Sequence, residues 1–146
     1  MGAENELLAH LLVDSVKELK NLHFTNEKQI KHSEMMLLIK LNKYLKEEKQ
    51  STIRTTDVSK ILGLSPSTIT PIINSLEEKG YIERIFDKTD RRVVFLQITK
   101  EGLKLEKELN QKMMQKSEYI VNYLGEKDTK EFIRILQKIL DCMKTT

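Results

Sequence analysis

The fold of this 146-residue chain is decided by residues 62–80, LGLSPSTITPIINSLEEKG. Ser65 and Pro66 predict a helix start, because a serine hydroxyl can accept a backbone N–H bond at the N-cap and proline suits the first helical position. Apolar residues then recur at helical spacing until Gly80, where the helix should end. The predicted buried side of this helix consists of Ile69, Ile72, Ile73 and Leu76.

A shorter helix precedes this one. Val58, Ile61 and Leu62 lie on one side of it, and Gly63 ends it, since glycine turns a chain at low cost where φ is positive. We expect Thr55 or Thr56 to cap its N-terminus. A short helix, a glycine turn and a capped second helix together predict a helix-turn-helix.

Two β-rich runs follow, residues 81–86 and 93–99, separated by the polar loop DKTDRR at residues 87–92. Val94, Leu96 and Ile98 alternate with their neighbours, which indicates a sheet with one face on the core. A hairpin directly after a helix-turn-helix is a wing. Further β-compatible residues surround Ile53.

The flanking segments are predicted to be helical. Residues 4–23 carry one apolar stripe, a second helix opens at His32 or Ser33, and a third follows Gly102 until Gly125 interrupts it. Asp128 and Glu131 resemble a capping box for a last helix. We therefore expect a mostly α fold with a small β-wing (α+β class) in a single domain, residues 1–146, with its DNA-binding part at about 51–100.

Composition restricts the function without identifying it. The chain is 39% hydrophobic and 32% charged with a net charge of +3, and the middle third holds the largest share of the excess. This charge is compatible with nucleic acid but is weak evidence for it. No apolar run reaches the roughly 20 residues of a membrane span and the N-terminus lacks a signal-peptide pattern, so we expect a cytoplasmic protein without a membrane partner. Cys142, the single cysteine, cannot form an internal disulfide.

The helix that begins at Ser65 and Pro66 is the second helix of the helix-turn-helix. Its side opposite the apolar stripe should carry the base-reading residues. Ser67, Thr70, Pro71 and Asn74 share that side. Asn74 is the most informative, because its amide can bind adenine N6 and N7 together. Ser65, Thr68 and the amides of the helix start suit phosphate. The alternative is a polar, solvated helix face.

Pro71 lies past the first turn of this helix. It cannot donate a hydrogen bond to the carbonyl of Ser67, so we expect the helix to bend or loosen there and to expose that carbonyl.

The wing loop offers further DNA contacts. Arg91 and Arg92 lie at the predicted hairpin tip, where a guanidinium can enter a narrow minor groove, and Asp90 could hold one of them by a bidentate bond. Lys88 would contact phosphate. The alternative is again an ordinary solvated loop.

Residues 62–102, LGLSPSTITPIINSLEEKGYIERIFDKTDRRVVFLQITKEG, resemble the MarR family of bacterial and archaeal regulators. The resemblance covers a recognition helix, a D-x-R wing (Asp90 and Arg92) and a turn of the L-x-x-T-x-x-G type ending at Gly102. It implies a winged-helix homodimer with dimerisation helices at about 1–30 and 102–146. It further implies a pseudo-palindromic operator in double-stranded DNA, a repressor role, and release by a small phenolic ligand or an oxidant. One departure is that no Arg or Lys lies between Ser65 and Leu76, where many relatives carry a basic residue at the place of Pro71.

A small-molecule effector would bind where the outer helices meet the winged part. Judged by their position in the sequence, the residues expected near that junction are His23, Phe24, His32, Met35, Met36 and Tyr44. Each of them also fits a plain core or surface role.

Other function classes find less support. The three histidines, His10, His23 and His32, have no metal-ligand spacing, and the sequence has no glycine-rich phosphate loop and no nucleophile elbow. We therefore expect no enzyme activity, no cofactor and no metal. The remaining alternative is a winged-helix protein-interaction or anti-repressor module with weak DNA binding, because the charge of the middle third is modest.

Overall fold

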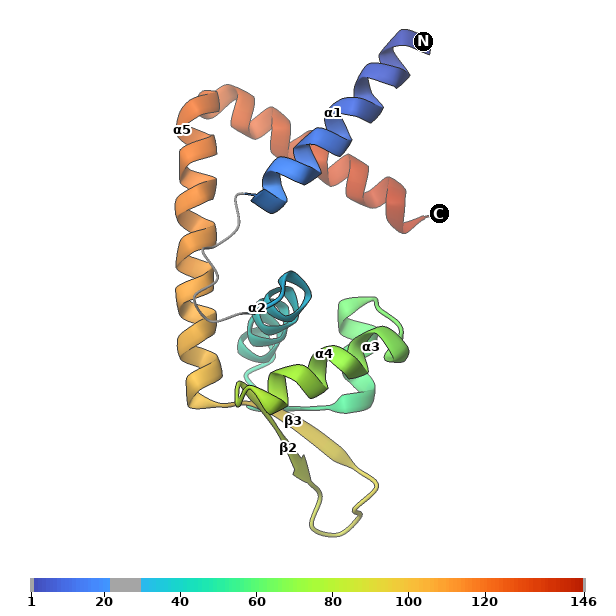
Figure 1. The fold of residues 1–146 in the computed structure, drawn as a ribbon, viewed down its shortest axis with the longest axis vertical. Helices are drawn as coiled ribbons and strands as arrows, with labels where there is room; N and C mark the ends of the chain where they lie inside the picture. The colour runs from blue at the N-terminus through green and yellow to red at the C-terminus, as the bar shows by residue number, and fades with distance from the viewer. Residues whose placement is uncertain (1, 22–29, 146) are drawn as a thin grey trace. The chain divides into compact units, whose positions relative to one another are not determined.

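The computed structural model describes residues 2–21 and 30–145. The chain divides into two compact units, Met1–Asn110 and Gln111–Thr146, and the expected single-domain organisation stays a prediction. The helices are α1 (Gly2–Asn21), α2 (His32–Glu47), α3 (Thr55–Leu62), α4 (Pro66–Glu78) and α5 (Lys100–Lys144), and the strands are β1 (Thr52–Arg54), β2 (Ile82–Phe86) and β3 (Val94–Ile98) (Figure 1). This confirms the mostly α, winged helix-turn-helix fold.

The three strands form one antiparallel sheet in the order β1-β3-β2. In the hairpin, Ile82 pairs with Ile98 and Phe86 pairs with Val94. On the other side of β3, Ile53 pairs with Leu96. The expected alternation is confirmed from Phe95 to Ile98, because Leu96 and Ile98 are buried while Phe95 and Gln97 are partly exposed. Val94, which was also expected on the core side, is only partly buried.

The hydrophobic core of the first unit joins α2, α3, α4, the sheet and the start of α5. Its most buried side chains include Leu38, Val58, Leu76 and Leu96, one from each of four elements, and each has an exposed fraction of 0%. Ile69 and Ile73 are buried as expected, whereas Ile72 is only partly buried. This core fixes α4 against α2 and the sheet, so the opposite side of α4 is left for solvent.

The turn from β3 into α5 depends on Thr99 and Gly102. The hydroxyl of Thr99 donates to the carbonyl of Gly80 at 2.6 Å and accepts from the N–H of Gly102 at 3.0 Å, while the N–H of Thr99 donates to the carbonyl of Tyr81 at 3.1 Å. A Cβ at residue 102 would lie 2.0 Å from that Tyr81 carbonyl oxygen. Only glycine allows α5 to begin so close to the backbone.

Two expected caps are wrong. The N-cap of α3 is Arg54, which makes no side-chain cap bond, and Thr55 Oγ1 instead donates to the carbonyl of Val94 on β3 at 3.1 Å. Asp128 does not cap a helix either, because the chain is helical again directly after Gly125 and Glu131 accepts a bond from Arg134 at 2.9 Å. Thr55 and Glu131 therefore each bind a partner that is not part of the expected cap.

Two expected glycine positions are confirmed. Gly63 ends α3 with φ 64°, and Gly125 interrupts α5 with φ 80° and ψ 171°. Within the described ranges, no helix combines the length and the apolar character that a membrane crossing requires.

Candidate nucleic-acid interface

The N-terminus of α4 carries a cluster of hydroxyl groups. Ser65 is its N-cap, and its Oγ accepts the N–H of Thr68 at 3.3 Å while lying 3.0 Å from Ser67 Oγ and 2.8 Å from Thr68 Oγ1. Pro66 follows at the first helical position as expected. Because these exposed groups lie at the positive end of the helix dipole, they suit an anionic phosphate oxygen.

The solvent side of α4 is formed by the residues that the sequence indicated. Ser67, Thr70, Pro71 and Asn74 are all exposed. Thr70 Oγ1 donates to the carbonyl of Pro66 at 2.8 Å, so its proton is used within the helix and the hydroxyl can only accept from another partner. The helix remains continuous through Pro71. These four residues are called the polar row of α4 below, and none of them carries a charge.

Arg84 of β2 brings a positive charge to this row, and sequence analysis missed it. Its Nη2 donates to Asn74 Oδ1 at 2.7 Å and its Nη1 donates to Glu77 Oε1 at 2.8 Å. The alternation of side chains along a strand could have found it. Arg84 is two residues from buried Ile82, so it lies on the sheet face that packs against α4. The cation that α4 lacks comes from the adjacent strand.

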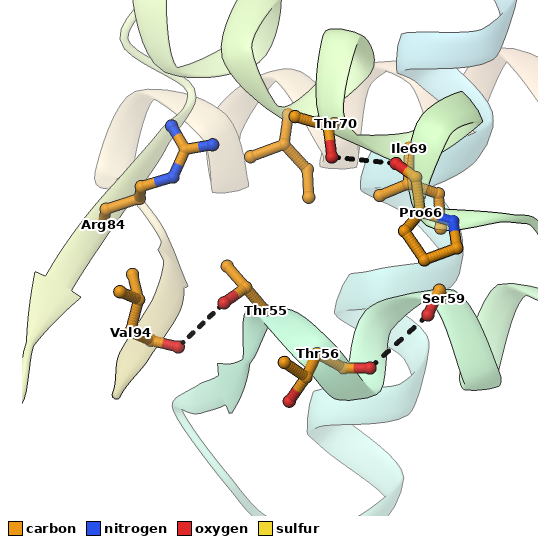
Figure 2. A pocket seen from close by; sticks show the side chains of 9 residues that line it. Thr55, Thr56, Ser59, Pro66, Ile69, Thr70, Arg84 and Val94 are labelled. Atoms are coloured by element: carbon orange, nitrogen blue, oxygen red, sulfur yellow. Dashed lines mark hydrogen bonds between the residues drawn. The ribbon is translucent and has the colours of Figure 1, made fainter. Parts of the chain in front are cut away.

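A cleft of about 340 Å³ lies between α3, α4 and the sheet. Arg84 of β2, Thr70 of α4 and Thr55 of α3 border it from three elements (Figure 2). The other residues that line it are Thr56, Ser59, Pro66, Ile69, Ile73 and Val94. The guanidinium of Arg84 thus belongs both to this cleft and to the polar row of α4.

The wing tip is a tight turn that presents two arginines. The N–H of Val93 donates to the carbonyl of Asp90 at 3.0 Å, so Arg91 and Arg92 take the two central positions. In place of the expected bidentate bond, one oxygen of Asp90 accepts from the backbone N–H of Arg92 at 3.0 Å and from its Nε at 3.4 Å. The side chain of Arg92 is 93% exposed. Lys88 and Arg91 are exposed as well.

The position of α4 is also set by a carboxylate of α2. Glu34 is 1% exposed and accepts from Lys79 Nζ at 2.7 Å, from the hydroxyl of Ser75 and from the N–H of Lys31 at 2.9 Å. Burial alone would raise the pKa of Glu34. The hydrogen bonds from Lys79, Ser75 and Lys31, together with the charge of Lys79, outweigh burial and hold that pKa below its ordinary value.

The expected effector residues are only partly described. His23 and Phe24 lie outside the described residues. His32 is exposed at the start of α2, Met35 is buried, and Met36 and Tyr44 pack partly buried against the core. The effector site therefore stays a prediction. Across residues 2–21 and 30–145, no group of three or more His, Cys, Asp or Glu side chains is placed to hold a metal ion.

Comparison with known proteins agrees with this geometry. The model of the MarR family matches residues 45–94. The HTH-type transcriptional regulator YpoP of Bacillus subtilis is 32% identical over 110 residues, which cover 75% of this chain and 72% of YpoP. YwhA, an HTH-type transcriptional regulator of the same organism, is 28% identical over 137 residues and covers 93% of this chain and 94% of its own length.

A solved structure shows the same arrangement. FabT of Streptococcus pneumoniae, crystallised in complex with DNA, superposes with a TM-score of 0.72 at 28% identity, covering 97% of this chain and 95% of its own. Its likeness extends beyond the residues that the family model matches.

Proposed function

This chain belongs to the MarR family of winged-helix transcriptional regulators, and we propose that it is a ligand-responsive repressor that binds a pseudo-palindromic double-stranded DNA operator as a homodimer. The observation that carries the DNA part is the exposed polar row of α4 beside a wing turn with two exposed arginines. FabT, which shares this fold, was solved bound to DNA.

Each part of the interface has a physical role in this proposal. The row of Ser67, Thr70, Pro71 and Asn74 faces base edges, since a helix fits the major groove. Ser65 and Thr68 at the start of α4 bind phosphate and fix the register. Arg92 enters the minor groove with Asp90 holding its backbone, and Lys88 and Arg91 contact phosphate.

Exposed apolar residues support the homodimer. Along α1 they include Leu8, Leu11 and Leu12, which are 46–55% exposed. The second unit separately exposes Phe132, Ile133, Ile135, Leu136, Leu140 and Met143. Monomers rarely expose such apolar stripes, and a second copy of the chain would remove them from water. A two-fold dimer also explains why two half-sites would be read.

The test is selection of binding sites from random duplex DNA by the purified protein at two salt concentrations. We expect a pseudo-palindrome whose half-site centres lie about 10 base pairs apart. Affinity should fall steeply with salt, because counterions are released when phosphates are neutralised. Light scattering in the same buffer should give twice the mass of the chain.

A negative selection would be informative. Binding to no sequence at either salt, with mass spectrometry showing no small molecule bound to the purified protein, would overturn the operator function and favour a protein-interaction or anti-repressor module. For the effector, we expect phenolic acids to displace the selected operator in a competition assay. Operator affinity unchanged across a panel of phenolic acids and peroxide would remove these inducers from the proposal.

A further inference from the structure

The contact between Arg84 and Asn74 changes what Asn74 can read. A guanidinium has only donors, so the atom of the Asn74 amide that faces Arg84 must be the carbonyl oxygen, as the 2.7 Å bond to Oδ1 has it. The amide orientation therefore follows from chemistry. With Oδ1 bound to Arg84, the NH₂ group, which is a donor, is the part of the exposed Asn74 amide that is left for another partner.

Arg84 is itself held in place. Its other amino group, Nη1, donates to Glu77 Oε1 at 2.8 Å, and Arg84 lines the cleft together with Ile69 and Ile73. The side chain keeps 25% of its surface exposed, and the bond from its Nη2 to Asn74 is exposed to solvent. Asn74 and Arg84 are thus joined into one edge that contains donors and a positive charge.

We propose that this composite edge makes Asn74 a reader of guanine rather than of adenine. In the major groove guanine offers two acceptors, N7 and O6, whereas adenine offers N7 beside the donor N6. An adenine N6 group would have to share Oδ1 with a guanidinium and would lie next to a positive charge. Arg84 is in this sense a positioning residue that determines specificity, and the inference rests on the proposed operator binding.

The experiment repeats the site selection with variants of the full chain. Asn74→Ala identifies the operator position that Asn74 faces, because the preference there should be lost. At that position the unmodified protein should prefer guanine over adenine by roughly tenfold or more, the range of one good bidentate contact. Arg84→Met keeps the apolar stem and removes the donors, so the preference should move to adenine.

Two further variants serve as controls. Arg54→Met removes an equal charge from an exposed residue of β1 and should leave the guanine preference in place while lowering affinity at most uniformly. Asn74→Asp, at an exposed position, keeps the bond to Arg84 but has no donor, so it should lose guanine even if Arg84→Met does not fold. Circular dichroism of each variant establishes its folding.

The outcomes separate the two proposals. If the unmodified protein selects an operator and prefers adenine at the Asn74 position, or if Arg84→Met still prefers guanine, the inference is wrong while operator binding stands. If Asn74→Ala changes the base preference at no position of the selected operator, the inference is also wrong while operator binding stands. If no operator is selected, the proposed function fails and the inference fails with it.

Discussion

Glu34 of α2 and Lys79 at the C-terminal end of α4 form an ion pair of 2.7 Å, and the carboxylate of Glu34 is 1% exposed while the Lys79 side chain keeps 29% of its surface in solvent. The pair links α2 to the end of α4 through two residues that lie 45 positions apart in sequence. Because Ser75 binds the same carboxylate, one side chain of α2 fixes the last turn of the proposed recognition helix.

Removing Lys79 should cost more stability than removing both partners. Lys79→Met leaves a buried carboxylate without its cation, so we expect a loss of about 2 to 4 kcal/mol in the free energy of unfolding at pH 7. The double variant Glu34→Gln with Lys79→Met removes both charges and should recover part of that loss. Urea titration at a fixed protein concentration measures the free energy of unfolding of the unmodified protein, of Lys79→Met and of the double variant.

Lys43→Met is the matched control for this pair. Lys43 and Glu47 are 3.9 Å apart with side chains 75% and 62% exposed, so the change should stay within about 0.5 kcal/mol. A double variant less stable than Lys79→Met would show that the pair does not couple in the way described.

The pH dependence of stability should carry the signature of Glu34. Its pKa in the folded state is lowered, so the unfolded chain binds its proton first as the pH falls. The stabilisation by this carboxylate is therefore complete above the ordinary glutamate pKa and is lost below it, as the pH falls through the lowered value. Glu34→Gln should differ most from the unmodified protein near neutral pH, and the difference should shrink in acid. A difference that stays constant down to pH 3 would contradict the lowered pKa.

Gly102→Ala should strongly destabilise the winged unit. The new methyl group would lie 2.0 Å from the carbonyl oxygen of Tyr81, which is backbone and cannot turn away. We expect a loss of about 3 kcal/mol or more, measured by thermal and urea unfolding. Gly2→Ala, which meets nothing within 4 Å, should be neutral. Normal stability of Gly102→Ala would mean that α5 can begin elsewhere.

Arg92→Ala should weaken binding to most DNA sequences and flatten the dependence of log affinity on log salt by about 1, as expected for one lost phosphate-region charge. The Arg92 side chain is 93% exposed, so its removal should leave folding unchanged. Arg134→Ala removes the same charge from a residue of the second unit that belongs to neither the wing nor α4, and it should leave the slope as it is. An unaltered slope for Arg92→Ala would place the wing off the DNA.

Much of the fold was readable from the sequence because its signals are local. The Ser65 cap, Pro66 at the first helical position and the positive φ of Gly63 each depend on a few neighbouring residues. The burial along β3 follows from a period of two. The exposed row of α4 follows from the helical period once the apolar side is known. These features needed no knowledge of what packs against them.

The partners of the polar side chains were decided only by the tertiary structure. Thr55 could have capped its own helix, yet it binds Val94, 39 residues away on the sheet. The choice depends on how α3 and β3 pack, and no periodic pattern contains that information.

The site shows the same division. The sequence by itself determined which residues of α4 face outward, because helical geometry and apolar spacing leave one side for solvent. Only the tertiary structure decided that Arg84 turns the Asn74 amide and that Glu34 holds the end of α4, since it alone brings these groups within hydrogen-bond distance. Hydrogen bonds between side chains act over about 3 Å, whereas sequence patterns report only which side of an element is buried.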